Sequence, residues 1–313
     1  MNTPYALDVV LATYNGEKYI AQQLDSLLNQ TYTDFSVLIR DDGSSDNTLA
    51  IVREYADKHP DRITLINSGE ISGNASKNFG VLLEKSKAKY VMCCDQDDIW
   101  LPDKVKYFMK MITFYEGVYG RSKPILFHAD LKVVSENLEP LNDSLWEYQN
   151  LKILWGQDFN RLLSQNIVTG CSSIMNRALL DVALPIPYGA VMHDWWLALV
   201  ANAFGILVSD RQALMLYRQH SKNVVGAKKY NSDSIWVLIN KLFERREIGK
   251  NLILGSEQAK DFYIRYPLHP KADVARDFAS LPTMSWLSKR IIVIRRRFWK
   301  MGFLRNVSWL IRM

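Results

Sequence analysis

The stretch Tyr90-Val-Met-Cys-Cys94, Asp95-Gln-Asp-Asp98, Ile99-Trp-Leu-Pro102 decides the fold of this 313-residue chain. A largely apolar, strand-like run ends in three carboxylates within four positions. Like charges this close raise each other's pKa unless a cation lies between them. Mg²⁺ and Mn²⁺ favour oxygen ligands, and Mg²⁺ commonly binds one or two carboxylates together with substrate phosphates. Because ligands of open α/β sheets bind beyond the carboxyl ends of strands, the stretch predicts a metal–phosphate site there.

A simpler interpretation is a solvated acidic turn in which Asp103 caps the next helix. Acidic turns are common, and an Asp-x-Asp pattern alone is a weak signal. The position of the cluster directly after a strand, in register with polar clusters after other strands, favours the metal–phosphate interpretation.

Strand-like and helix-like segments alternate through the N-terminal half. Strands are predicted over residues 7–12, 35–40, 63–67 and 90–94. Helices are predicted over residues 17–30, from the 41–46 turn to about 58, and over 76–87, where apolar residues recur at helical spacing. This alternation predicts βαβ units, an α/β fold and a mostly parallel sheet with right-handed crossovers.

Three of these strands end in polar clusters: Thr13-Tyr14-Asn15, Asp41-Asp42 and Asp95-Gln96-Asp97-Asp98. Parallel strands point their carboxyl ends the same way, so we expect the clusters to converge on one rim of the sheet. The alternative is three ordinary strand-to-helix turns, which explains the turn residues but not their acidic and aromatic character. The sequence has no Gly-x-Gly-x-x-Gly or Walker loop, which excludes an evident dehydrogenase or P-loop NTPase.

The rest of the body adds two further polar motifs. Strands are predicted over 125–134, 167–175 and 206–209, an amphipathic segment over 151–164, and helices from 232 onward. Met192-His-Asp-Trp-Trp196 opens a predicted helix reaching about residue 203, and Asp194 could be only its N-cap. Tyr217-Arg-Gln-His-Ser-Lys222 follows a strand, and a histidine among cations in a polar loop suits phosphate or metal contact.

Composition predicts a globular protein of the reducing cytosol. The sequence is 48% hydrophobic and 12% aromatic, which excludes disorder and allows a large core. Cys93, Cys94 and Cys171 form no Cys-x-x-Cys pair, so neither a disulfide framework nor a zinc site is expected. We expect no signal peptide and no membrane span, because no apolar stretch reaches about 18 residues.

The net charge of +6 is concentrated in the tail. Residues 285–313 carry eight basic and no acidic side chains, together with five aromatics: Trp286, Phe298, Trp299, Phe303 and Trp309. This combination predicts an interfacial segment on an anionic membrane, with Gly302 as a possible helix break. A C-terminal helical subdomain or a contact between subunits of a homo-oligomer are the alternatives. Nucleic acid is not an expected partner, because the body shows no basic stripe.

Five stretches of the chain resemble the family 2 glycosyltransferases, which have the nucleotide-binding, Rossmann-like GT-A fold. These are Val9-Val-Leu-Ala-Thr-Tyr-Asn-Gly16, Leu38-Ile-Arg-Asp-Asp-Gly-Ser-Ser-Asp46, Cys94-Asp-Gln-Asp-Asp-Ile-Trp100, Met192-His-Asp-Trp-Trp196 and Tyr217-Arg-Gln-His220. The resemblance covers about residues 5–226. It implies a catalytic domain over 1–226 and leaves a helical C-terminal region over 227–313. The acidic, His-Asp-Trp and Tyr-Arg-Gln-His motifs are similar to those of bacterial rhamnosyltransferases that build cell-wall rhamnan or O-antigen chains.

The resemblance implies an inverting, metal-dependent transferase that uses Mg²⁺ or Mn²⁺. It would move L-rhamnose from dTDP-β-L-rhamnose to a lipid-linked polysaccharide precursor at the inner face of the plasma membrane. A UDP-hexose donor with the same mechanism is the alternative. A two-metal nucleotidyltransferase or phosphohydrolase is less favoured, because no second carboxylate cluster is evident. A non-catalytic scaffold is less favoured because the acidic positions are all present.

The resemblance also implies roles for individual residues. The donor-site residues are Thr13, Tyr14, Asn15, Asp41, Asp42, Asn78, Asp95 and Arg218. Among them, Tyr14 would pack on the base, Asp41 would accept the base N–H, and Asp95 would touch the ribose or diphosphate.

On the reaction side, Asp97 would bind the metal, with His220 as a second protein ligand. Asp194 would be the catalytic base, and Trp195 would lie on the acceptor side. Growing charge on the departing diphosphate could be stabilised by the metal and by Arg218 or Lys222.

Overall fold

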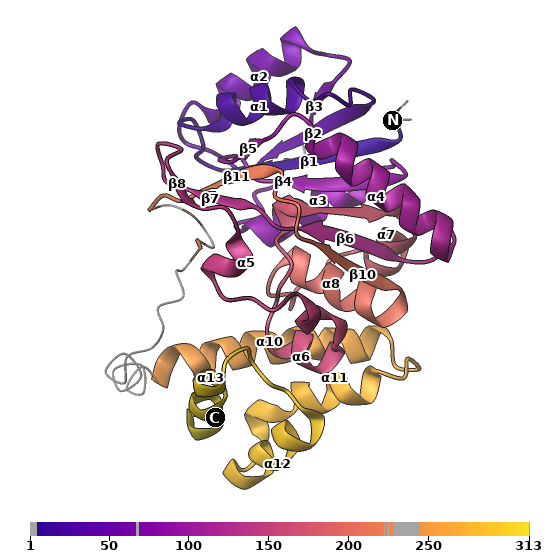
Figure 1. Cartoon of the computed structure of the whole chain (residues 1–313), viewed down its shortest axis with the longest axis vertical. Helices are drawn as coiled ribbons and strands as arrows, with labels where there is room; N and C mark the ends of the chain where they lie inside the picture. Colours follow the sequence, from indigo (N-terminus) through magenta and orange to yellow (C-terminus); the bar gives the residue numbers. More distant parts are fainter. Residues whose placement is uncertain (1–4, 67–68, 222, 224–225, 228–244, 313) are drawn as a thin grey trace.

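The computed structural model of the chain describes residues 5–66, 69–221, 223, 226–227 and 245–312. Its centre is a seven-stranded sheet in the order β10-β6-β9-β4-β1-β2-β3 (Figure 1). The strands are β1 (Leu7–Thr13), β2 (Phe35–Asp41), β3 (Ile63–Leu65), β4 (Tyr90–Cys94), β6 (Ile125–Ala129), β9 (Ser173–Asn176) and β10 (Ile206–Asp210).

The pairing of these strands confirms the predicted α/β fold with a mostly parallel sheet. β1 pairs in parallel with β2 on one side and with β4 on the other. Only β9 runs against its neighbours β4 and β6. The register sets Thr13 opposite Asp41 and Leu11 opposite Cys94. The three polar clusters therefore follow neighbouring strands at one edge, as expected.

Alternating side chains of the sheet enter two cores, one on each face, because successive strand residues point to opposite sides. Val9 and Leu11 pack on one face with helices α1 (Ile20–Leu28), α2 (Thr48–Lys58) and α4 (Lys104–Tyr119). Val10 packs on the other face with α3 (Ala75–Lys85), α7 (Arg177–Ala183) and α8 (His193–Phe204). Coverage of both faces explains why the strands read as nearly continuous apolar runs.

The prediction of one strand over residues 125–134 was wrong. After β6 the chain leaves the large sheet and enters a second sheet of four strands in the order β5-β11-β7-β8. These are β5 (Ile99–Trp100), β7 (Lys132–Val134), β8 (Pro140–Asn142) and β11 (Met215–Arg218). The break falls at Asp130, whose buried carboxylate accepts hydrogen bonds from the backbone N–H groups of Leu131 and Trp146. The N–H of Leu131 is the next one along the chain, and a carboxylate that binds a local N–H competes with the strand ladder.

Two other expected segments are shorter or divided. The amphipathic stretch 151–164 forms a 3₁₀ turn, Ile153–Gln157, and helix α6 (Phe159–Ser164). They separate at Asp158, whose side chain caps α6. The predicted strand over 167–175 begins only at Ser173, after a 3₁₀ turn at Gly170–Ser172. Elsewhere the expected strands are found within a few residues of their predicted ends.

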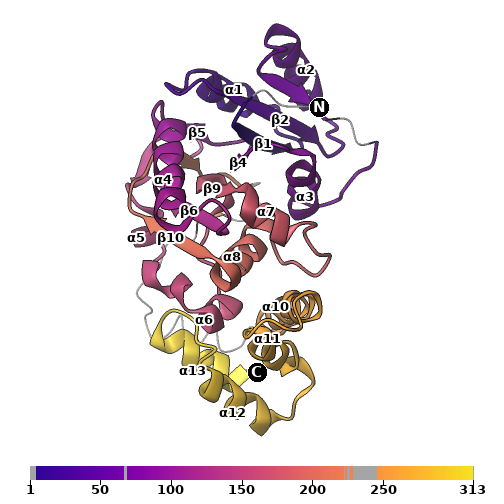
Figure 2. The ribbon, with the colours of Figure 1, turned by 90° about the vertical axis from the view of Figure 1, so that its right-hand side faces the viewer.

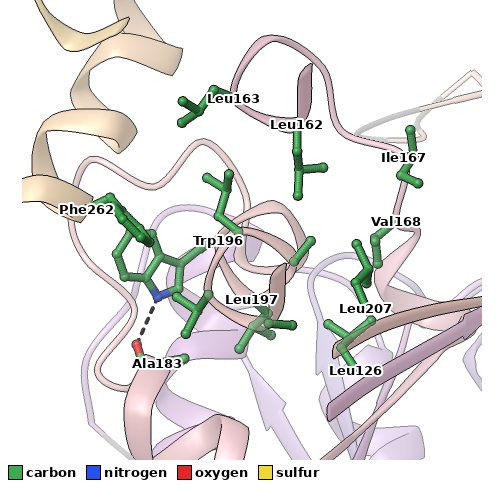
Figure 3. Close-up of a cluster of buried hydrophobic side chains, with 14 of the residues drawn as sticks. Leu126, Leu162, Leu163, Ile167, Val168, Ala183, Trp196, Leu197, Leu207 and Phe262 are labelled. Carbon is green, nitrogen blue, oxygen red and sulfur yellow. Dashed lines mark hydrogen bonds between the residues drawn. The ribbon is translucent and has the colours of Figure 1, made fainter. Parts of the chain in front are cut away.

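The C-terminal helices share the core of the second face. They are α10 (Arg245–Arg265), α11 (Ala272–Ala279), α12 (Trp286–Arg296) and α13 (Phe303–Arg312). Figure 2 shows them below α8, with α10 beside α6. Phe262 joins the cluster around Trp196, whose indole Nε1 donates to Ala183 O at 2.9 Å (Figure 3). The division at residue 226/227 stays a prediction, and residues 228–244 lie outside the described part of the chain.

The tail is therefore partly a core element. Phe298 and Trp309 are buried, so the prediction that these two rings meet a membrane was wrong. They fill the apolar cluster because α12 and α13 pack on α10 and α11. The expected helix break is confirmed: α12 ends at Arg296, and Gly302 has a φ of 94° before α13 begins. Within the described ranges, no helix is both long and apolar enough to cross a bilayer.

Gly205, between α8 and β10, provides a test of the packing at the edge of the large sheet. A Cβ added to Gly205 would lie 1.8 Å from Pro124 O, the atom that accepts a hydrogen bond from Ile206 N. Gly205→Ala should therefore lower the free energy of unfolding by about 2–3 kcal/mol, measured by urea denaturation. The matched control is Gly117→Ala in α4, where an added Cβ meets nothing within 4 Å. The control should be neutral or stabilising, and equal effects of the two substitutions would contradict the packing described.

Candidate active site at the strand ends

The ends of β1 and β2 are joined by Asp41. Thr13 Oγ1 donates to Asp41 Oδ1 at 2.8 Å. Ser44 donates to the same carboxylate through both its hydroxyl and its backbone N–H, at 2.6 and 2.8 Å, and Gly43 N at 3.1 Å. The four bonds fix the loop after β2 against β1. They also use most of the acceptor capacity of the carboxylate, so its predicted contact with the base stays a prediction.

Tyr14 is presented to solvent by its backbone contacts. The side-chain amide of Gln96 binds Tyr14 N and Tyr14 O, both at 2.9 Å. Asn15 has a φ of 48°, and its Oδ1 accepts from Ser45 N at 2.8 Å. The Tyr14 ring is left 59% exposed, as a ring that packs on a planar base would need to be. Gln96 was missed in the sequence, where its only signal was its place inside the acidic cluster.

Asp42 and Asn78 lie in the interior, around Arg40. Arg40 donates to Asp42 Oδ1 at 3.1 Å and to Asn78 Oδ1 at 2.8 Å, and all three side chains are buried. Asp42 also accepts from Ser72 N and Gly73 N. These contacts lie beneath the edge of the sheet where the polar clusters meet, and they fix the loop that follows β3. The donor contacts predicted for Asp42 and Asn78 stay predictions, and the sequence did not single out Arg40.

The carboxylates of the acidic cluster after β4 raise one another's pKa, as their spacing predicts. Burial and the charge of Asp97 raise the pKa of Asp95 to about 6 and that of Asp98 well above its usual value. Asp98 Oδ2 is buried without a hydrogen-bond partner among the described residues. Oxygen atoms of Asp95 and Asp98 and the sulfur of Cys171 lie within 4.8 Å of one another.

These oxygen donors fit a hard divalent cation, whereas the thiol does not. Burial raises the pKa of Cys171 well above its ordinary value, and the thiol hydrogen-bonds Asp95. Lys104, which the sequence did not single out, lies fully buried behind the cluster and donates to Cys171 O at 2.6 Å. Its ammonium sits 3.6 Å from the centre of the Trp100 ring.

Asp97 and His220 meet across 123 residues of sequence. Their Oδ2 and Nε2 atoms lie 2.8 Å apart, and the His220 ring stacks on Tyr19 with centroids 4.8 Å apart. A carboxylate oxygen and an imidazole nitrogen are both ligand types for divalent transition metals. The structure thus brings together the two residues predicted to hold the ion, while ligation itself stays a prediction.

Arg218 is a buried link between β11 and the acidic loop. Its backbone N donates to Asp98 Oδ1 at 3.0 Å, and its guanidinium donates to Asp97 O at 2.8 Å. Further guanidinium bonds reach Glu136 O and Gln22 Oε1. Arg218 is therefore placed to position the carboxylates of the acidic loop, and its contact with the donor stays a prediction. Lys222, predicted to stabilise the departing phosphate, lies outside the described residues.

Asp194 lies in the first turn of α8. The N-cap of this helix is Met192, so the interpretation of Asp194 as an N-cap was wrong. Its carboxylate accepts from Gly170 N at 3.0 Å and from Asn166 Nδ2 at 3.2 Å. Burial outweighs these hydrogen bonds and raises the pKa of Asp194 to about 7. A carboxylate with a near-neutral pKa is suited to accept a proton at physiological pH.

The two tryptophans after Asp194 have different environments. Trp196 is fully buried in the core. Trp195 is half-buried, and its Nε1 donates to Leu162 O at 2.7 Å. Trp195 also lines a cavity of about 250 Å³ next to the C-terminal helices. A larger cavity, of about 420 Å³, lies between α1 and β5 and is lined by none of the predicted site residues.

Acidic and polar side chains at adjacent ends of parallel strands form a ligand-binding edge of the kind found in open α/β proteins. Residues 8–181 match the family described as Glycosyl transferase family 2. The chain is 31% identical over 268 residues to the dTDP-rhamnosyl transferase RfbG of Shigella flexneri, covering 82% of this chain and 88% of the relative. The chain belongs to glycosyltransferase family 2.

Other comparisons agree on the family and the fold. An Escherichia coli β-1,3-glucosyltransferase, WfgD, is 32% identical over 120 residues, or 37% of this chain and 46% of the relative. Staphylococcus aureus TarS 1–349, solved with UDP-GlcNAc, superposes with a TM-score of 0.55 at 17% identity, over 96% of this chain and 89% of that one. A Pyrobaculum calidifontis mannosyltransferase, solved with GDP-Man and Mn²⁺, gives 0.54 at 16% identity, over 98% and 85%. The predicted GT-A fold is confirmed.

Proposed function

We propose that this glycosyltransferase is inverting and metal-dependent and moves L-rhamnose from dTDP-β-L-rhamnose to a hydroxyl of a lipid-linked glycan. The observation that carries the proposal is the pairing of a metal-ligand set with a near-neutral carboxylate. Asp97 faces His220, and the charge of nearby Asp95 contributes to the raised pKa of Asp194. One group of side chains can hold the donor diphosphate while another takes the acceptor proton.

The rhamnose donor is supported by the relative from Shigella flexneri, which aligns over most of both chains. The relative WfgD, a UDP-Glc transferase, keeps a UDP-hexose donor as the alternative, although it aligns over a much shorter stretch. The exposed Tyr14 ring offers a stacking surface for either pyrimidine base.

Asp97, His220 and Asp95 would hold the metal with the donor diphosphate, and Mn²⁺ or Mg²⁺ there would neutralise charge developing on the leaving phosphate. Buried Arg218 and Lys104 hold the surrounding backbone in place through their bonds to Asp97 O and Cys171 O. An imidazole ligand favours Mn²⁺ over Mg²⁺, which prefers all-oxygen sites. The Mn²⁺ in the mannosyltransferase complex supports this preference.

Asp194 would accept the proton of the acceptor hydroxyl as the hydroxyl attacks the anomeric carbon. Asn166 and Gly170 orient the carboxylate through its two oxygens. Gly170 also allows this close approach, because an added Cβ would lie 3.3 Å from Asp194 Cβ and 2.8 Å from His193 Nε2. A single displacement from the face opposite the leaving diphosphate inverts the anomeric centre.

A membrane-bound acceptor is supported by the outer surface of α12 and α13, which we call the apolar tail surface. Its exposed apolar side chains are Trp286, Leu287, Ile291, Ile294, Phe303, Val307 and Ile311. In α13 they recur every four residues and form one stripe. Arg295, Arg297 and Arg305 are exposed on the same two helices or the link between them. Exposed apolar and basic groups together suit an anionic lipid surface, so we propose a peripheral location at the inner face of the membrane.

The donor is tested by incubating the chain with dTDP-rhamnose, UDP-glucose, UDP-galactose or UDP-N-acetylglucosamine and Mn²⁺. We expect dTDP-rhamnose to be consumed fastest with a lipid-linked glycan acceptor, measured as nucleotide release. Faster consumption of any UDP-sugar would overturn the rhamnose assignment and leave the family and the base in place.

The metal is tested by Asp97→Ala and by removal of divalent ions. Both should abolish transfer and weaken dTDP binding in Mn²⁺, because the ion joins the chain to the diphosphate. Asp57→Ala, at an exposed acid of α2, is the matched control and should leave both unchanged. An undiminished rate of sugar transfer by the unchanged chain in EDTA would contradict the metal-dependent mechanism.

The base is tested by the pH dependence of kcat/KM. The base must be ionised, so the rate should rise with pH and level off above about 7, the pKa given by burial of Asp194. Asp194→Asn should remove this rise of kcat/KM with pH. It should also lower turnover by about 10²–10⁴-fold, with little change in dTDP affinity.

Asn166→Ala is the control for the base, because it removes one hydrogen bond to Asp194 and keeps the carboxylate. It should cost far less turnover than Asp194→Asn. Near-normal turnover of Asp194→Asn, with the rise of kcat/KM with pH retained, would assign the proton transfer to another group.

The membrane contact is tested by replacing Trp286, Leu287 and Phe303 with Ser. These side chains are exposed, so folding should survive, whereas truncation of the tail would remove buried Phe298 and Trp309. Binding to phosphatidylglycerol vesicles should fall at least about tenfold, since each buried apolar side chain contributes roughly 1.5–3 kcal/mol. Ile264→Ser with Leu268→Ser, at exposed apolar positions elsewhere, should not change vesicle binding. Loss of self-association instead, with vesicle binding intact, would make the surface a subunit contact.

A further inference from the structure

A second cavity lies on the far side of the residues that orient Asp194. It has a volume of about 250 Å³ and lies between the segment after α6, the start of α8 and the C-terminal helices. Figures 1 and 2 both show α6 against these helices. Asn166 and Trp195 line it, and Asn166 Nδ2 donates to Asp194 Oδ1 at 3.2 Å. None of the predicted donor residues is among its lining, whereas Trp195, which was predicted to lie on the acceptor side, is.

Two residues that line this cavity carry hydrogen-bond donors with no partner among the described residues. Ser164 and Trp309 both line it, and they are 6% and 2% exposed. Ser164 Oγ and Trp309 Nε1 are buried without a hydrogen bond to any described residue. Buried polar groups in native proteins are nearly always paired, so two unpaired donors around one cavity point to a ligand with acceptor oxygens.

The same wall carries uncompensated positive charge. Lys300 lines the cavity, and its ammonium lies 4.1 Å from the centre of the Trp309 ring. In the described part of the chain, no carboxylate comes within salt-bridge distance of Lys300. Burial, with a smaller effect from the like charge of Arg305, lowers the pKa of Lys300 to about 8. An anion in the cavity would relieve both the repulsion and the desolvation.

We infer that this cavity binds an oxyanion carried by the acceptor, held by Lys300, Trp309 Nε1 and Ser164 Oγ. The assignment of this anion to the acceptor rests on the proposed function, while the anion site itself follows from the cavity alone. The oxyanion has two chemical sources: a phosphate that links the glycan to its lipid, or the carboxylate of an acidic sugar. Binding there would set the distance between the anion and the hydroxyl presented to Asp194, and so would select which hydroxyl reacts.

The test is titration calorimetry of the full chain with pyrophosphate and, separately, with glucuronate, in EDTA. Without a metal, the carboxylates of Asp95, Asp97 and Asp98 repel anions, so binding reports the basic cavity. Lys300→Met should weaken binding of the preferred anion about tenfold or more, the loss of a charged hydrogen bond. Trp309→Phe should weaken anion binding several-fold. If Trp309→Phe does not fold, Ser164→Ala takes its place and should have the same effect. Lys260→Met, at an exposed lysine of α10, should bind like the unchanged chain.

Stronger binding of pyrophosphate assigns the cavity to an acceptor phosphate, and stronger binding of glucuronate assigns it to an acidic sugar. Absence of binding of both anions, or equal binding by the unchanged chain and a folded Lys300→Met variant, would overturn the inference.

A second readout separates this inference from the proposed function. In transfer assays, Lys300→Met should raise the acceptor KM and leave dTDP affinity in Mn²⁺ unchanged. Unchanged acceptor KM with normal transfer would reject the cavity's role and keep the transferase. Cavity-dependent anion binding, with no transfer from any nucleotide sugar, would keep the site and reject the proposed function.

Discussion

The structure depends on keeping three neighbouring carboxylates at the end of one buried strand. Asp95, Asp97 and Asp98 repel one another, and burial raises the pKa of Asp95 and Asp98 further. The chain offsets part of this repulsion with Arg218 N–H on Asp98 and His220 on Asp97. These partners come from the second sheet and the loop after it. The second sheet therefore supports the acidic loop. The unpaired Asp98 Oδ2 shows that compensation by the described residues is incomplete, which is the condition a divalent cation would satisfy.

Much of the large sheet could be predicted from the sequence, because its strands are buried on both faces and alternate with helices. The convergence of the polar clusters followed from one rule, that parallel strands end on the same side. The second sheet could not be predicted in this way. Its strands are two to four residues long, too short for a periodic signal, and Asp130 divides what reads as a single apolar run. Local sequence does not reveal that this carboxylate will bind the backbone N–H of the next residue and that of Trp146 in helix α5 (Leu145–Tyr148).

The site residues divide along the same line. Pairing Asp97 with His220 required a resemblance to known proteins, because 123 residues separate them. The interior roles of Arg40 and Lys104 had no signal, since each reads as an ordinary polar residue near a turn. Gln96 was marked only by its place inside the acidic cluster. The basic tail illustrates the opposite error: aromatic residues beside cations predicted a membrane surface, but Phe298 and Trp309 are core. Whether an aromatic side chain of the tail is buried or exposed depends on the helix that packs against it. The periodicity of the tail alone does not show that helix.

We propose that the acidic strand end and the distant histidine form one metal site that presents the donor to Asp194. Anomalous X-ray diffraction from crystals of the chain with Mn²⁺ and dTDP-rhamnose tests it most directly. We expect an anomalous peak bounded by Asp97, His220 and the donor diphosphate, with the thymine against Tyr14 and the anomeric carbon facing Asp194. A peak elsewhere, or a nucleotide bound with no metal beside Asp97, would contradict it.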